Sequence, residues 1–251
     1  MALVFAHRGG AKLRPENTLL AFDHGLSLGA DGLEFDVRLS RDGVVVVHHD
    51  ATLERTTDGT GPVAARTADE LARLDAGFHF EAHRGRTGGV PRLQDVLRRY
   101  PAARCIIEMK VNEPELAHRT IDAVRAARAV DRVALGSFGT RVLRAARDYE
   151  PRIPTGASRE ETRLALYRSW VRWPVRRPAY REFQVPEVSG STRVVSPRFV
   201  RYAHEARVSV AVWTVDAEDD MRRLLAWGVD AIISDRPDIA VQVARAGRPT
   251  S

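Results

Sequence analysis

Strand-like and helix-like segments alternate along most of this chain, and the alternation limits the folds that it can adopt. Short runs of aliphatic and β-branched residues, typical of buried strands, are separated by longer stretches with apolar residues at helical spacing. The expected strands cover residues 3–6, 32–39, 104–109, 133–137, 153–157, 183–185, 208–214 and 231–234. Because strands that alternate with helices form parallel sheets, about eight such units predict an α/β fold, a TIM-type (βα)8 barrel.

Helices are expected between these strands. The first opens at residues 15–18 and stops before Gly29. Further helices are predicted over residues 68–74, 93–100, 114–129, 140–149, 160–169, 197–206 and 218–227. A chain of 251 residues with 44% hydrophobic content can bury one large core, so we expect a single barrel domain over residues 1–251. Residues 51–89 lack strong periodicity, which is typical of a functional segment or an insertion.

The expected strand over residues 32–39 carries the clearest chemical signal. Leu33, Phe35 and Val37 alternate with Glu34 and Asp36, so the two carboxylates share one face of the strand. At about 3.3 Å rise per residue, their Cα atoms lie about 6.6 Å apart. Without a cation, two carboxylates on an inward face repel each other and one must stay protonated. The pair therefore predicts a metal site.

The carboxyl ends of other strands bring further polar residues toward this pair. His7 ends the first strand, while Glu108 and Lys110 share a face at the end of the strand over residues 104–109. In a barrel the carboxyl ends of the strands lie at one rim, and neighbouring strands are about 4.8 Å apart. We therefore expect Glu108 to complete a pocket of three carboxylates with the first pair.

Composition limits the class of partner and the cellular compartment. The chain has 39 basic and 33 acidic residues and a net charge of +6, and only Lys12 and Lys110 are lysines. The arginines form no dense block and no recognised binding motif is present, so we expect no nucleic-acid partner. Cys105 stands alone, which excludes an internal disulfide. The first apolar strand follows Met1 too closely for a signal peptide, and no apolar run has membrane-spanning length, so we expect a cytoplasmic protein.

Eight short motifs stand in order along nearly the whole chain. They are HRGG from His7, PENTLLAF from Pro15, GADGLEFDV from Gly29, DGVVVVHHD from Asp42, LERTTDGTG from Leu53, IIEMK from Ile106, VWTVD from Val212 and GVDAIISDRP from Gly228. Together they resemble the glycerophosphodiester phosphodiesterase family. The resemblance implies a barrel with a small insertion after the second strand, here about residues 50–89. Ser40, Arg92 and Asp216 depart from the family's usual residues, outside the presumed chemistry.

The resemblance also implies a role for each site residue. It implies that His7 and His49 act as acid and base. It also implies that Glu34, Asp36 and Glu108 bind a divalent cation, and that Arg8 and Lys110 contact the phosphate. Three carboxylates with no soft ligand favour Mg²⁺ or Ca²⁺ over Zn²⁺. A zinc-dependent barrel hydrolase is also disfavoured, because the first strand ends in His-Arg rather than in two histidines spaced for a metal.

These side chains suit the cleavage of a small-molecule glycerophosphodiester to glycerol 3-phosphate and an alcohol such as choline or ethanolamine. The phosphate charge must be neutralised and the leaving alcohol must be protonated. Two histidines that titrate near neutrality can take a proton from the nucleophile and give one to the leaving group. The nucleophile is either water or the neighbouring glycerol hydroxyl, and the resemblance favours the hydroxyl.

For several residues near these motifs, the sequence indicates whether they belong to the active site or have a structural role. His48 and His49 face opposite ways on an extended chain, so only one enters the site, and the motif favours His49. Trp213 ends an apolar strand at the barrel rim, where we expect it to line the substrate pocket. Arg55 fits a site role and a solvated loop charge equally well.

Two alternative functions would use the same site. Trp170, Trp173, Tyr180 and Phe183 are interleaved with arginines, and such a segment could make weak peripheral contact with an anionic membrane. That contact would suit a lysophospholipase D-like enzyme acting on lysolipids, although a solvated loop is the favoured interpretation. An inactive phosphate-ligand binder should lack a histidine or a carboxylate, and this chain lacks none.

Overall fold

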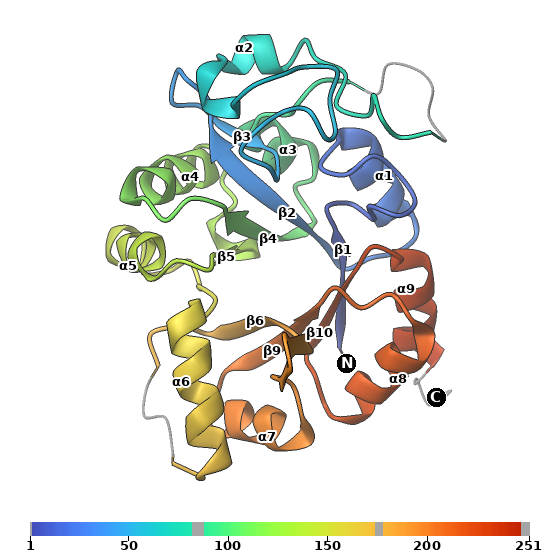
Figure 1. The fold of residues 1–251 in the computed structure, drawn as a ribbon, viewed down its shortest axis with the longest axis vertical. Helices are drawn as coiled ribbons and strands as arrows, with labels where there is room; N and C mark the ends of the chain where they lie inside the picture. The colour runs from blue at the N-terminus through green and yellow to red at the C-terminus, as the bar shows by residue number, and fades with distance from the viewer. Residues whose placement is uncertain (1, 82–87, 174–177, 247–251) are drawn as a thin grey trace.

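Seven parallel strands form a barrel surrounded by helices in a computed structural model, which describes residues 2–81, 88–173 and 178–246 (Figure 1). Around the sheet the strands follow the order β5, β4, β2, β1, β10, β9 and β6. Their bounds are β1 Leu3–His7, β2 Gly32–Leu39, β4 Arg104–Met109, β5 Val133–Gly136, β6 Glu182–Pro186, β9 Ser209–Trp213 and β10 Ala231–Ser234. The predicted TIM-type barrel is confirmed.

Residues 153–157 span the gap between β5 and β6, where the sequence predicted a fifth strand. Thr155 forms a single parallel bridge to Leu135 of β5, and Gly156 forms one to Glu182 of β6. Pro154 has no amide hydrogen, so the ladder cannot extend through it. The segment occupies the place of a strand without regular pairing, and the barrel is nearly closed.

Helices cover the outside of the barrel. They are α1 Leu19–Ser27, α3 Leu93–Arg99, α4 Pro114–Ala126, α5 Thr140–Tyr149, α6 Arg159–Trp170, α7 Pro197–Glu205, α8 Glu218–Ala226 and α9 Pro237–Ala246. α9 was not among the helices expected from the sequence. α1 begins later than residue 15, because Asn17 has a positive φ of 58° and Thr18 caps the helix by accepting a hydrogen bond from the Ala21 amide.

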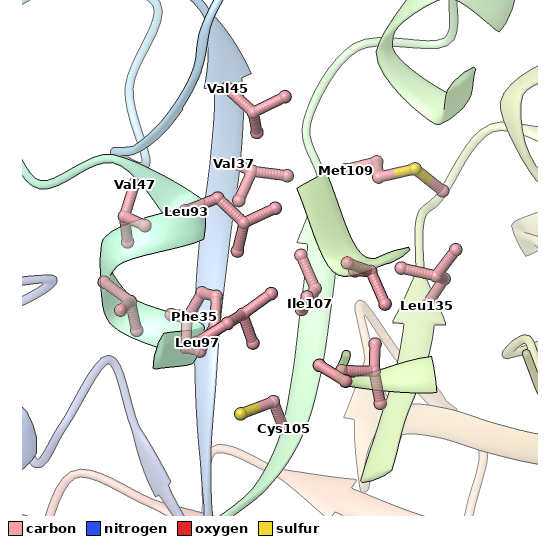
Figure 2. Close-up of a cluster of buried hydrophobic side chains, with 14 of the residues drawn as sticks. Phe35, Val37, Val45, Val47, Leu93, Leu97, Cys105, Ile107, Met109 and Leu135 are labelled. Atoms are coloured by element: carbon pink, nitrogen blue, oxygen red, sulfur yellow. The ribbon is translucent and has the colours of Figure 1, made fainter. Parts of the chain in front are cut away.

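Alternation along the strands separates two layers of side chains. Leu33, Phe35 and Val37 of β2 are fully buried against the helices, while Glu34 and Asp36 between them point to the opposite side. Figure 2 shows this outer layer, with the labelled side chains Phe35, Val37, Leu93, Leu97, Ile107, Met109 and Leu135. A slip of one residue would turn the apolar set toward the barrel interior and the two carboxylates toward the helices, so this layer also fixes the register of the acidic residues.

An insertion follows β2, at the place that the resemblance implied. β3 Val45–Val47 pairs antiparallel with β2, and the chain then leaves the barrel before it returns at α3. The insertion holds the 3-10 helix η1 Val63–Ala65 and the short helix α2 Ala68–Leu71, which has a capping box. Figure 1 shows it at one edge of the barrel, beyond the end of β2.

A small hairpin after β6 was not expected from the sequence. β7 Val188–Ser189 and β8 Thr192–Arg193 pair antiparallel, and Gly190 in the turn has a positive φ of 60°. Strands of two residues carry too little alternation to be detected in a sequence. The hairpin lies in the connection to α7 and, as described below, borders the cavity of the barrel.

Candidate active site

The three predicted acidic residues come together at the carboxyl ends of the strands. Asp36 of β2 is in register with Glu108 of β4, and Glu34 is in register with His7 of β1. One carboxylate oxygen from each of Glu34, Asp36 and Glu108 lies within 4.8 Å of the others. The two-residue spacing along β2 and the register with β4 thus produce the cluster expected from the sequence.

This acidic cluster has the properties of a cation site. Oε2 of Glu34 and Oδ1 of Asp36 are buried and accept no hydrogen bond. Burial, together with the charges of Asp36 and Glu108, raises the pKa of Glu34 to about 8. A divalent cation would give both oxygens a direct ligand contact in place of the missing hydrogen bond, and a set of carboxylate oxygens suits a hard ion. The residues present therefore fit a metal ion.

Asp36 also lies between two cationic side chains. Nε of Arg8 is 3.1 Å from its Oδ2 atom, and Nζ of Lys110 is 3.3 Å from its Oδ1 atom. Asn17 donates a hydrogen bond of 3.0 Å to Oδ2 from its side-chain amide. Burial opposes ionisation of Asp36, but Arg8 and Lys110 outweigh it, so the pKa of Asp36 is lowered. The two predicted phosphate contacts therefore lie directly beside the acidic cluster.

His7 is held between two acidic residues. Its Nδ1 atom donates to Oδ1 of Asp235 at 2.7 Å, and its Nε2 atom lies 3.8 Å from Oε2 of Glu34. Burial alone would lower the pKa of His7, but Glu34 and Asp235 raise it above the usual value. With Nδ1 bound to Asp235, Nε2 is the ring nitrogen directed at the acidic cluster.

The two adjacent histidines of the HHD motif separate as expected. His49 lines the same cavity as His7, and its Nδ1 atom lies 2.6 Å from Oδ1 of Asp50. His48 is 4% exposed and its Nε2 atom lies 3.0 Å from the Thr52 carbonyl oxygen, away from the cavity. The structure therefore brings His49, and not His48, to the acidic cluster's cavity.

Four acidic or amide side chains that the sequence did not assign hold the predicted ones in place. They are Glu16, Asn17, Asp50 and Asp235. All four fall within the PENT, HHD and SDRP parts of the motifs, which is the signal that could have found them. Arg55 does not line the cavity. It bonds to Asp50 and donates to both carboxylate oxygens of Glu16, and Glu16 also accepts from Arg8 at 2.9 Å.

A cavity of about 770 Å³ opens above these groups. The predicted residues that line it are His7, Arg8, Glu34, His49, Glu108, Lys110 and Trp213. Asp36, 1% exposed, lies just behind this lining. Trp213 borders the cavity as expected, and its ring packs edge-to-face on Phe138, another lining residue, with centroids 5.9 Å apart.

The aromatic segment considered above for membrane contact, residues 170–183, divides into a buried part and an exposed part. Tyr180 and Phe183 are 6% and 1% exposed and belong to the hydrophobic core, so they offer no surface to a membrane. Trp170 and Trp173 are 47% and 65% exposed, and residues 174–177 lie outside the described residues. Among the described helices, none combines the length and the apolar character needed to cross a bilayer.

This arrangement is that of a barrel hydrolase acting on phosphodiesters, and comparison with known proteins identifies the family. A family model described as the glycerophosphoryl diester phosphodiesterase family matches residues 7–239, and the chain belongs to this family. A glycerophosphodiester phosphodiesterase of Caldanaerobacter subterraneus subsp. tengcongensis is 33% identical over 251 residues, covering 98% of each chain. The protein is accordingly an enzyme, a phosphoric diester hydrolase of the glycerophosphodiester type.

Solved structures show the same fold. The crystal structure of a glycerophosphodiester phosphodiesterase from Agrobacterium tumefaciens is similar with a TM-score of 0.81 at 30% identity, covering 96% of this chain and 100% of that one. An Oleispira antarctica phosphodiesterase, solved in complex with the product sn-glycerol-3-phosphate, has a TM-score of 0.79 at 24% identity, and the match covers 98% of this chain and 97% of that one.

Proposed function

We propose that this enzyme is metal-dependent and cleaves glycerophosphodiesters to glycerol 3-phosphate and an alcohol, with His7 and His49 as the proton-transfer residues. The observation that carries the proposal is the shared cavity, which both histidines line together with carboxylates of the acidic cluster. One polar centre thus holds the groups that a phosphodiester needs for charge neutralisation and for proton transfer. The chain would act as one barrel domain.

The cation would be held by Glu34, Asp36 and Glu108. Mg²⁺ and Ca²⁺ are the candidates, because the three side chains offer only carboxylate oxygens. When bound, the ion would supply positive charge to the phosphate oxygens and help to position the glycerol. Removal of the repulsion within the cluster would also favour the ionised form of Glu34.

Arg8 and Lys110 would bind the phosphate. Both line the cavity, and both already contact Asp36 behind the lining, which fixes their positions before substrate arrives. Glu16 holds the guanidinium of Arg8 from the other side at 2.9 Å. Cations fixed in this way stabilise negative charge on phosphate oxygens without the cost of reorganisation during the reaction.

The two histidines would act through their Nε2 atoms. Each Nδ1 atom faces an aspartate, Asp235 for His7 and Asp50 for His49. Such a contact fixes the orientation and tautomer of the ring and supports its positive form after proton uptake. One histidine would take the proton of the attacking group, water or the glycerol hydroxyl, and the other would protonate the leaving alcohol, each worth typically about 10² to 10⁴ in rate. On the hydroxyl route the product of this step is a cyclic phosphate, which water would then open to glycerol 3-phosphate with the two histidines in exchanged roles.

The first test is the release of glycerol 3-phosphate from glycerophosphocholine by the purified protein. We expect turnover with Mg²⁺ or Ca²⁺, loss of turnover with a chelator, and recovery on addition of either ion in excess. The Oleispira antarctica protein with bound sn-glycerol-3-phosphate supports the choice of product. Binding of glycerol 3-phosphate without any turnover on a panel of glycerophosphodiesters would instead identify an inactive ligand binder.

A further inference from the structure

The cavity does not stop at the reaction centre but continues along one face of α6. The α6 residues that line it are Arg159, Thr162, Arg163, Leu166, Tyr167 and Trp170. Their spacing of three or four residues places all six on a single side of the helix. At 1.5 Å rise per residue, this lining extends for about 16 Å. A glycerophosphodiester with a small head group does not need a cavity of that length.

Polarity changes along this face, from cationic at its start to apolar at its end. The Arg159 amide donates to the Phe138 carbonyl at 3.1 Å, and the guanidinium carbon of Arg159 lies 5.1 Å from the Phe138 ring centroid. Nζ of Lys110 lies 5.9 Å from the centroid of the same ring. The first turn of α6 therefore borders the reaction centre, whereas Trp170 stands at the far end.

The far half of the face offers apolar surface. Tyr167 and Trp170 are 53% and 47% exposed, and their rings form an edge-to-face pair with centroids 5.2 Å apart. Leu166 lies beside them and is 6% exposed, anchored in the core. Across the cavity the lining comes from β6 and the segment after the β7–β8 hairpin, with the apolar residues Val185, Pro186 and Val194.

We propose that this α6 face binds the hydrocarbon chain of a glycerophosphodiester that carries one acyl or alkyl chain. The polar end of such a molecule would meet the reaction centre, and its chain would lie against Leu166, Tyr167 and Trp170. The proposal rests on the proposed function of the reaction centre, because the cavity joins the two. The chain can be attached to the glycerol or to the leaving alcohol, and both forms share the recognised chemistry.

The occupant is a single chain rather than a bilayer surface, because the apolar face is a wall of the cavity that contains the histidines. Trp173, which is 65% exposed, is not part of the lining. Membrane contact through the end of α6 would depend on Trp173 as well as on Trp170. Trp173→Ala is thus the matched control for Trp170→Ala, since both remove an exposed indole from the same region.

The experiment measures kcat/KM against chain length, with all substrates kept below their micelle concentrations. One series has butyryl, hexanoyl and octanoyl chains on the glycerol of glycerophosphocholine, and the other has the same chains on the nitrogen of glycerophosphoethanolamine. We expect kcat/KM to rise in at least one series, by up to about fourfold for each added methylene, the equivalent of about 0.8 kcal/mol. The series that responds identifies the side on which the chain sits.

Trp170→Ala should abolish this rise and leave the turnover of unacylated glycerophosphocholine unchanged, while Trp173→Ala keeps both. No rise in either series would overturn the proposal, and so would an equal loss in the two variants. Calorimetric binding of the same acylated compounds to chelator-treated protein needs no turnover. Chain-length-dependent binding without cleavage would support the α6 site even if the proposed reaction failed.

Discussion

Nδ1 of His7 lies 2.7 Å from Oδ1 of Asp235. This contact links the last residue of β1, the first barrel strand, to the residue that follows β10, the last barrel strand. These strands are neighbours, because β1 pairs in parallel with β10 and closes this side of the barrel. His49 repeats the arrangement with Asp50 at 2.6 Å. Both proposed proton-transfer residues are therefore oriented by a carboxylate on the same ring nitrogen.

Asp235→Asn should lower kcat by about tenfold to a thousandfold with little change in KM, because the ring of His7 loses the charge that fixes its tautomer. Steady-state kinetics on glycerophosphocholine measure both constants. Asp238→Asn is the matched control, since Asp238 pairs with Arg236 at 2.8 Å and does not contact His7. Equal activity in the two variants would show that Asp235 does not position the histidine.

His7→Ala and His49→Ala should each reduce kcat by about a hundredfold or more, with a smaller effect on KM, since their roles lie in the transition state. His204→Ala serves as the control, because His204 contacts Asp230 on the surface at 2.8 Å. Thermal melting of each variant would check that the fold is intact. An unchanged kcat in either active-site variant would remove that residue from the mechanism.

In the absence of a cation, stability should fall as the pH rises from about 4.5 to about 8. The pKa of Glu34 is raised to about 8 in the folded protein by burial, so the folded state holds a proton that the unfolded chain has released. Each pH unit in this window lowers the free energy of unfolding by at most about 1.4 kcal/mol. Thermal melting in chelator tests this, and Glu34→Gln should flatten the profile. A wild-type profile as flat as that of the variant would contradict the prediction.

Cys105 should resist alkylation in the native protein at neutral pH. Its side chain is 2% exposed, and burial raises the pKa of the thiol to about 11, so almost no thiolate forms. Mass spectrometry after iodoacetamide treatment should show modification in denaturant and none in buffer over the same time. Rapid labelling of the folded protein would mean that the strand opens readily.

The barrel could be predicted from the sequence because strand and helix periodicities are local. The strands over residues 104–109 and 231–234 have the expected bounds, since each is a short apolar run between clear breaks. The irregular segment at 153–157 could not be distinguished from a strand by its apolar pattern. It forms only single bridges to β5 and β6, because Pro154 has no amide hydrogen to extend the ladder. The hairpin at Gly190 was too short to carry a pattern.

The acidic cluster was predictable for the same reason, as Glu34 and Asp36 share a face by period two. The supporting contacts were not, because Asp235 is separated from His7 by 228 positions along the chain. Asn17, which donates to Asp36, has a positive φ of 58°, a backbone conformation that the sequence pattern does not reveal. The face of α6 that lines the cavity depends on how the helix packs on the barrel, which a helical pattern alone does not define.

The central claim is that Glu34, Asp36 and Glu108 bind a divalent cation on which catalysis depends. The most direct measurement is a calorimetric titration of chelator-treated protein with Mg²⁺ and with Ca²⁺, paired with glycerophosphocholine turnover at each point. We predict that activity returns in step with the binding of a cation. Glu34→Gln, Asp36→Asn and Glu108→Gln should each lower the cation affinity and the turnover by about a hundredfold or more. Full turnover by metal-free protein, or unchanged binding in all three variants, would contradict the claim.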